Sequence, residues 1–168
     1  MDTRGSAQLI RDALKEAGID FICSLPDLKI AALVRAVEED PIIKHIPLCR
    51  EEEGIGICAG AYLTGKRAAL IMQNGGFLNC CNALTTTSLQ FEIPVLLLIY
   101  YAGDIGDRGF TTLGSVTEPV LEALGIRFYT PRKMEEIKKT IVGAEVLASD
   151  SKRPVAVLLT KDVLGQDL

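Results

Sequence analysis

The stretch that decides the fold spans residues 50–66 and reads Arg50-Glu51-Glu52-Glu53-Gly54-Ile55-Gly56-Ile57-Cys58-Ala59-Gly60-Ala61-Tyr62-Leu63-Thr64-Gly65-Lys66. Three carboxylates are followed here by glycine, alanine and small apolar residues. A short apolar run at residues 46–49 comes directly before, and we interpret it as a buried strand. The stretch therefore predicts a helix over residues 51–64 that packs closely against the sheet and holds a carboxylate at its buried N-terminal end.

Strand-like and helical segments alternate along the rest of the chain. Short apolar runs predict strands at residues 21–25, 67–73, 94–100, 126–129 and 154–159. Helical spacing of apolar residues predicts helices at residues 7–17, 26–37, 77–90, 116–124 and 134–148. Such alternation is typical of an α/β protein with a parallel sheet. We expect residues 1–168 to form a single three-layer domain, with about six parallel strands and helices on both faces.

The composition excludes several classes of protein. With 48% hydrophobic and 24% charged residues, the chain is neither disordered nor fibrous. Its net charge of −4, without a block of Lys and Arg, argues against a nucleic-acid surface. The longest apolar run, residues 93–101, is interrupted by Pro94 and is too short to span a bilayer. The N-terminus lacks the apolar region of a signal peptide, so we expect a cytoplasmic protein.

The cysteines point to a reducing environment. The five cysteines form no C-x-x-C pair, and His45 is the only histidine, which argues against a zinc site. We therefore predict no metal bound by this chain and interpret the thiols as small, buried, apolar groups. His45 lies in a polar connection, so we expect it to be exposed.

Polar and glycine-rich segments follow the predicted strands. Ligands of parallel α/β sheets bind at the carboxyl ends of the strands. The segments that leave those ends are residues 24–27, 50–53, 73–76, 101–115 and 130–132. The long Gly- and Asp-rich segment 101–115 has no clear periodicity, and its length favours a functional loop.

The three adjacent glutamates allow two interpretations. Acidic residues in a first helical turn offset the positive end of the helix dipole, which needs no function. Alternatively, one carboxylate points inward. Glu52, Gly56, Ala59 and Leu63 share one small and apolar helix face, so Glu52 is the predicted inward carboxylate. A partly buried carboxylate there could share a proton with a ring nitrogen.

Four motifs together resemble one family, the pyrimidine-binding (PYR) domain of thiamine-diphosphate decarboxylases. They are Gly18-Ile19-Asp20-Phe21 leading to Ser24-Leu25-Pro26-Asp27, Glu52-Glu53-Gly54 ten residues before Tyr62, Ala59-Gly60-Ala61-Tyr62-Leu63-Thr64-Gly65-Lys66, and Met72-Gln73-Asn74-Gly75-Gly76 with Asn79 and Asn82. The similarity covers essentially the whole chain and implies a flavodoxin-like fold. Within the family the chain is most similar to α subunits that act on sulfopyruvate, and phosphonopyruvate decarboxylases are close relatives.

The resemblance implies roles for individual residues. Glu52 would be catalytic and would hydrogen-bond the N1′ atom of the thiamine diphosphate aminopyrimidine, while the cofactor supplies the carbanion chemistry. Gln73, Asn74 and Gly75 would also bind the cofactor, although an ordinary Gly-rich turn explains them equally. Substrate contacts are assigned to Ser24, Asp27, Arg50 and Asn79. For these four, helix capping, packing or plain surface charge is the alternative.

The other half of the cofactor site is missing from the sequence. In the family, Mg²⁺ and the diphosphate bind a Gly-Asp-Gly segment followed by paired asparagines. Here Gly103-Asp104 is followed by Ile105, and no asparagine lies downstream. The resemblance therefore implies a separate β-type subunit, and a hetero-oligomer with the cofactor at the interface.

The expected reaction is the decarboxylation of 3-sulfopyruvate to sulfoacetaldehyde in coenzyme M biosynthesis. Two alternatives stay open. One is the same chemistry on phosphonopyruvate or another 2-oxo acid. The other is a non-catalytic, flavodoxin-like binding module that kept the fold and lost the site.

Overall fold

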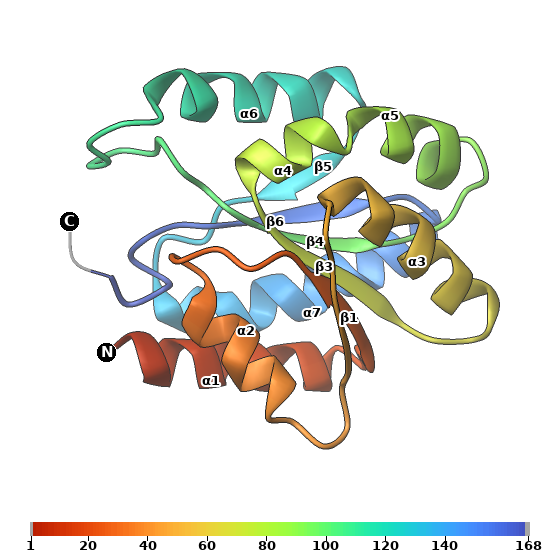
Figure 1. The fold of residues 1–168 in the computed structure, drawn as a ribbon, viewed down its shortest axis with the longest axis horizontal. Coiled ribbons are helices and arrows are strands. Elements are labelled where there is room, and N and C mark those ends of the chain that lie inside the picture. Colours follow the sequence, from red (N-terminus) through yellow and green to blue (C-terminus); the bar gives the residue numbers. More distant parts are fainter. Residues whose placement is uncertain (1, 167–168) are drawn as a thin grey trace.

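A computed structural model describes residues 2–166, which form one parallel sheet between two layers of helices (Figure 1). Within these residues the sheet has six strands in the order β2-β1-β3-β4-β6-β5. All five pairings between neighbouring strands are parallel, which confirms the predicted α/β class. The strands are β1 (Phe21–Ser24), β2 (Lys44–Pro47), β3 (Ala68–Gln73), β4 (Leu96–Tyr100), β5 (Arg127–Tyr129) and β6 (Val155–Leu159).

The helices cover both faces of the sheet, as Figure 1 shows. One face carries α1 (Thr3–Glu16), α2 (Ala31–Glu38) and α7 (Met134–Ser151). The other face carries α3 (Glu51–Leu63), α4 (Asn74–Asn79), α5 (Cys81–Ala83), the π-helical turn η1 (Leu84–Leu89) and α6 (Thr111–Ala123). Within residues 2–166, no helix combines the length and apolar character that a membrane span requires.

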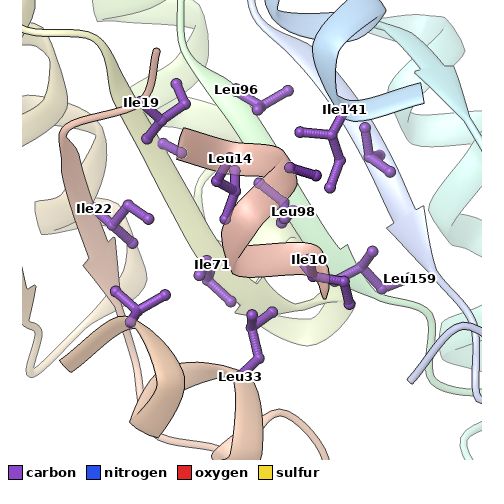
Figure 2. Packing of buried hydrophobic residues seen from close by; sticks show 14 of the residues in the cluster. Ile10, Leu14, Ile19, Ile22, Leu33, Ile71, Leu96, Leu98, Ile141 and Leu159 are labelled. Atoms are coloured by element: carbon purple, nitrogen blue, oxygen red, sulfur yellow. The ribbon is translucent and has the colours of Figure 1, made fainter. Parts of the chain in front are cut away.

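Each face of the sheet has its own hydrophobic core. Successive side chains of a strand point to opposite faces, so one strand contributes to both cores. On β3, for example, Ile71 faces the core beneath α1, whereas Leu70 faces the core beneath α3. Figure 2 shows Ile10 and Leu14 of α1 packed over the sheet beside Leu98 of β4. The central strands are therefore buried on both sides, as a parallel sheet requires.

Several predicted boundaries were wrong. Residues 74–76 are the first turn of α4 and not a loop, and residues 111–115 belong to α6. The helix predicted over residues 77–90 is divided into α4, α5 and η1. The Oγ1 atoms of Thr85 and Thr86 donate to the carbonyls of Cys81 and Asn82 at 2.8 and 2.9 Å. Such bonds to the carbonyl four residues earlier compete with the regular helical pattern and distort it.

The prediction for His45 was also wrong. Strand β2 begins at Lys44, two residues earlier than expected, and this shift brings His45 into the sheet. Its side chain is only 8% exposed. The reason is tertiary: β2 is an edge strand, but β1 lies beside it in the sheet and helix α2 packs against one of its faces.

Helix α3 approaches the sheet most closely at Gly54. A Cβ atom at that position would lie 2.7 Å from both Leu48 Cδ1 and Leu70 Cδ1, nearer than real Cβ contacts. By contrast, a Cβ atom on Gly60, in the same helix, would meet nothing within 4 Å in the described chain. Gly54 is therefore required for packing, whereas Gly60 is not required within this chain.

We predict opposite effects of the two alanine substitutions on the free energy of unfolding of the purified chain. Gly54→Ala forces two leucines out of place and should destabilise the fold by about 1–3 kcal/mol. Gly60→Ala only improves helix propensity and should stabilise it by up to about 1 kcal/mol. Urea unfolding followed by circular dichroism measures both, and equal effects of the two variants would contradict the close packing at Gly54.

Candidate active site at the carboxyl edge of the sheet

The strand order reverses between β1 and β3. From β1 the chain continues to its outer neighbour β2, and from β3 it continues to β4 on the other side. Ligands of open α/β sheets bind in the crevice that such a reversal leaves at the carboxyl ends of the strands. Gln73, at the end of β3, donates from Nε2 to Asp27 Oδ2 at 3.3 Å. The structure thus brings together two of the predicted site residues from segments 46 positions apart.

The three glutamates of α3 have three different environments. Glu53 caps its own helix, because its Oε2 accepts hydrogen bonds from the backbone N–H groups of Cys49 and Arg50, both at 3.3 Å. Glu51 lies against α4, where a Cβ atom on Gly76 would overlap its carboxyl group. These two side chains therefore have structural surroundings, and Glu52 remains as the candidate for chemistry.

One oxygen of Glu52 is buried without a partner. Oε1 forms an ion pair with Arg50 Nη2 at 2.8 Å, and the side chain is 31% exposed. Oε2 is buried and has no hydrogen-bond partner among residues 2–166. Buried carboxylate oxygens are nearly always hydrogen-bonded, so this atom marks a place where a donor from outside the chain would fit.

The predicted inward face of α3 was wrong. Of the residues expected to share it with Glu52, Ala59 is buried, but Gly56 is exposed and Leu63 is 75% exposed. The side packed on the sheet consists instead of Gly54, Ile55, Cys58, Ala59 and Ala61. The close approach at Gly54 sets this orientation. Glu52 consequently stands at the border between the packed side and an open, apolar side of the helix.

Negative charge gathers at this edge. Burial raises the pKa of the Cys80 thiol to about 12, and the nearby charges of Glu51 and Glu52 contribute to the shift. Burial likewise raises the pKa of Tyr100 to about 12, with further contributions from Asp107, Asp27 and Asp104. Both groups stay protonated at neutral pH. Three of the carboxylates at this edge are paired with cations, Glu52 with Arg50, Asp104 with Arg132 and Asp107 with Lys161.

The amide nitrogen of Asn74 is occupied within the protein, whereas its Oδ1 is buried without a partner among residues 2–166. The side chain is fully buried, and its Nδ2 donates to Ala102 O at 2.8 Å and to Thr117 Oγ1 at 2.9 Å. It therefore ties α4 to the end of β4 and to α6. The neighbouring Gly75 fits a narrow space beside Gln73, since a Cβ atom on Gly75 would lie 3.2 Å from Gln73 Oε1.

Two further predicted residues lie apart from this cluster. The Ser24 hydroxyl is buried on the α2 side of the sheet and is hydrogen-bonded to His45 at 2.8 Å. Asn79 is exposed at the last residue of α4. The structure thus joins Asp27, Gln73 and Gly75 at the end of β3 and pairs Arg50 with Glu52 at the start of α3, and it gives Ser24 and Asn74 partners inside the fold.

The sequence reasoning missed how the segment after β4 is anchored. Asp104 pairs with Arg132 ahead of α7, and Asp107 pairs with Lys161 after β6. Asp107 Oδ2 also accepts from the N–H of Gly103 at 2.7 Å. The Gly- and Asp-rich composition indicated a loop, but the ion-pair partners are 28 and 54 positions away and carry no local signal.

Known proteins are similar in sequence to this chain over most of its length. Residues 4–104 match the family model described as "Thiamine pyrophosphate enzyme, N-terminal TPP binding domain". The chain is 42% identical to sulfopyruvate decarboxylase subunit alpha of Methanocaldococcus jannaschii over 92% of both chains. It is 35% identical to the subunit of that name from Methanococcus maripaludis, over 92% of this chain and 93% of that one.

A third relative is longer. The chain is 30% identical to sulfopyruvate decarboxylase of Methanosarcina acetivorans over 90% of its own length but only 39% of that protein. Together with the parallel sheet and the carboxylate at its edge, these matches show that the chain belongs to the thiamine pyrophosphate enzyme family, among the α subunits of sulfopyruvate decarboxylase.

Proposed function

We propose that this chain is the α subunit of a thiamine-diphosphate-dependent decarboxylase that converts 3-sulfopyruvate to sulfoacetaldehyde and CO₂ in coenzyme M biosynthesis. The observation that carries the proposal is the unpartnered, buried Oε2 of Glu52 at the carboxyl edge of the sheet. All five cysteines are free, which is compatible with work in the cytoplasm, where thiols stay reduced.

Glu52 would be the catalytic group of this chain. Its Oε2 can accept the hydrogen bond of the aminopyrimidine N1′ and share a proton there, while Oε1 keeps the ion pair with Arg50. The bound cofactor supplies the electron sink that decarboxylation of a 2-oxo acid needs. Glu53 holds the first turn of α3 in place by capping it, so Glu52 does not need to move to meet its ligand.

The remaining predicted residues would form the walls of the site. Gln73 and Gly75 lie beside the crevice and would contact the cofactor, and Asn74 would support them from behind. Asp27 is partly exposed and would contact the substrate beside Gln73. Arg50, whose side chain is 70% exposed, is suited to an anionic substrate because a guanidinium binds sulfonate and carboxylate groups well. Ser24 and Asn79 are less suited to contact the substrate, since the Ser24 hydroxyl has a partner inside the fold and Asn79 lies at the last residue of α4.

A β-type subunit would complete the site. This chain has no Gly-Asp-Gly segment for Mg²⁺ and the diphosphate, and the longer relative named sulfopyruvate decarboxylase extends well beyond the part matched here. The open side of α3 supports an interface, because Ile57 is 37% exposed and Leu63 is 75% exposed beside two glycines. A helix that is apolar on all sides is usually covered on all sides. Thiamine diphosphate and Mg²⁺ would then lie between the two subunits of a hetero-oligomer.

We predict that Glu52→Gln in the assembled enzyme lowers kcat by at least about 10²-fold, because the amide cannot share the proton. Glu51→Gln is the matched control: it is a neighbouring carboxylate in the same helical turn, and it should retain activity within about threefold. Steady-state CO₂ release measures both, and thermal unfolding checks that both variants fold. Full activity of Glu52→Gln would refute the assigned role.

Reconstitution tests the partner and the substrate. The tagged chain, recovered from its native extract, should bring down in equal amount a second chain that bears Gly-Asp-Gly and paired asparagines. The pair should release CO₂ from sulfopyruvate only with thiamine diphosphate and Mg²⁺, and each subunit alone should be inactive.

A panel containing phosphonopyruvate and pyruvate would separate the competing substrates. Faster turnover of phosphonopyruvate than of sulfopyruvate would replace the proposed substrate while keeping the chemistry. A chain that comes down alone, with no activity on any 2-oxo acid, would instead favour the non-catalytic module.

A further inference from the structure

The single histidine of the chain links three elements on the α2 side of the sheet. His45 Nε2 of β2 lies 2.8 Å from Ser24 Oγ of β1, and His45 Nδ1 lies 3.5 Å from Glu38 Oε1 of α2. Ser24 is 1% exposed and the His45 side chain 8%, whereas the Glu38 side chain is 52% exposed. The three side chains therefore form a row that runs from solvent at Glu38 inward to Ser24, at the carboxyl end of β1.

The proton arrangement in this row follows from its two ends. A carboxylate only accepts hydrogen bonds, so we assign the hydrogen of the neutral ring to Nδ1, the nitrogen that lies 3.5 Å from Glu38 Oε1. Nε2 of a neutral ring then has a free lone pair, and the Ser24 hydroxyl donates to it. Burial lowers the pKa of His45, and the charge of Glu38 offsets only part of that shift, so the ring is neutral at pH 7.

Ser24 connects this row to both sides of the crevice. It is the last residue of β1, and its carbonyl accepts from the N–H of Leu48 at 2.9 Å. Leu48 in turn packs against Gly54 at the start of α3, the helix that carries Glu52. In the other direction the chain passes from Ser24 directly into the loop that holds Asp27 against Gln73. A shift of Ser24 would therefore move the β1–α2 loop relative to the start of α3.

We propose that His45 is a positioning residue of the enzyme: its neutral ring fixes Ser24, and through Ser24 it sets the β1–α2 loop against the 2-oxo acid substrate. This inference rests on the proposed function for the identity of that substrate. The His45 ring lies on the α2 side of the sheet, whereas Glu52 lies on α3 at the other face. His45 therefore acts through its hydrogen bond to Ser24 and not on the reacting atoms.

Acid should break the arrangement. Around the ring, α2 presents Glu38, β1 presents the neutral Ser24 and the apolar Ile22, and Lys44 of β2 points to the opposite side of the strand. A protonated ring must donate from Nε2, which reverses the bond and leaves the buried Ser24 hydrogen without its acceptor. The folded chain takes up this proton less readily than the unfolded chain. The neutral His45 ring therefore contributes fully to the free energy of unfolding above about pH 6.5. This contribution is lost as the pH falls toward the lowered pKa of the folded chain.

Nitrogen NMR of the assembled enzyme tests the row without relying on activity. With a ¹⁵N-labelled, tag-free α chain and an unlabelled partner subunit, the only imidazole signals come from His45, because the chain has no other histidine. We expect at pH 7 a protonated Nδ1 and an unprotonated Nε2, with a titration midpoint below that of a free histidine. A proton on Nε2 at pH 7, or an ordinary midpoint, would overturn the proposal.

Kinetics of four variants, His45→Ala, His45→Gln, Ser24→Ala and the double Ala variant, test the consequence. His45→Ala should raise KM for the 2-oxo acid by about tenfold with kcat nearly unchanged, since one buried hydrogen bond is lost. His45→Gln, whose amide oxygen can accept from Ser24, should restore KM at pH 7.5 and should lose the rise in KM that the wild type shows below about pH 6.5. Combining Ser24→Ala with His45→Ala should add little to either single change.

The outcomes separate this inference from the proposed function. An active wild type with unchanged KM in His45→Ala, or with the same KM in the Ala and Gln variants, would overturn the role of His45 alone. A wild type that releases no CO₂ from sulfopyruvate or any other 2-oxo acid would overturn the proposed function and this inference with it.

Discussion

The close approach of α3 to the sheet at Gly54 is the constraint on which the candidate site depends. Without a side chain at this position, Leu48 and Leu70 fill the space between helix and sheet. The helix is therefore held at a fixed depth and a fixed rotation, with its first turn at the carboxyl edge. Glu53 then caps the turn, Glu51 rests on Gly76, and Glu52 is left at the border of the packed side with one oxygen unpaired.

Around this turn, the carboxyl edge is held by polar contacts rather than by a continuous apolar core. Asn74 ties α4 to β4 and α6, and two ion pairs anchor the segment after β4. Phe110 adopts a left-handed conformation with φ 55°, and Gly103 and Gly114 meet at a distance that no side chain would allow. Such over-determined geometry is typical of sites that must be preformed. Two ion pairs and the close approach of Gly103 and Gly114 thus anchor this segment at the edge of the sheet.

In the function proposed above, the chain is one half of a catalytic unit. It offers a carboxylate with an unsatisfied oxygen, an exposed guanidinium and an open apolar helix side, but it carries no motif for a diphosphate or its metal. A well-packed core coexists here with exposed large apolar residues such as Leu63 on α3, which the proposed partner would cover. Physically, burial within the chain stabilises the subunit, and burial between chains remains available to stabilise an assembly.

The sequence by itself determined the class of fold and proposed a key residue. Alternating apolar runs and helical periods specify a parallel sheet covered on both faces, and the acidic start of a glycine-rich helix, with the family resemblance, made Glu52 the candidate. These signals are local, and local signals can be read from one chain. Only the tertiary structure decided which way α3 faces, because that depends on how closely Gly54 packs against Leu48 and Leu70 once the helix lies on the sheet. It also buried His45 beside Ser24 and turned Asn74 toward Thr117. Pairings between residues 21 and 43 positions apart leave no periodic trace, so they exist only once the sheet has assembled.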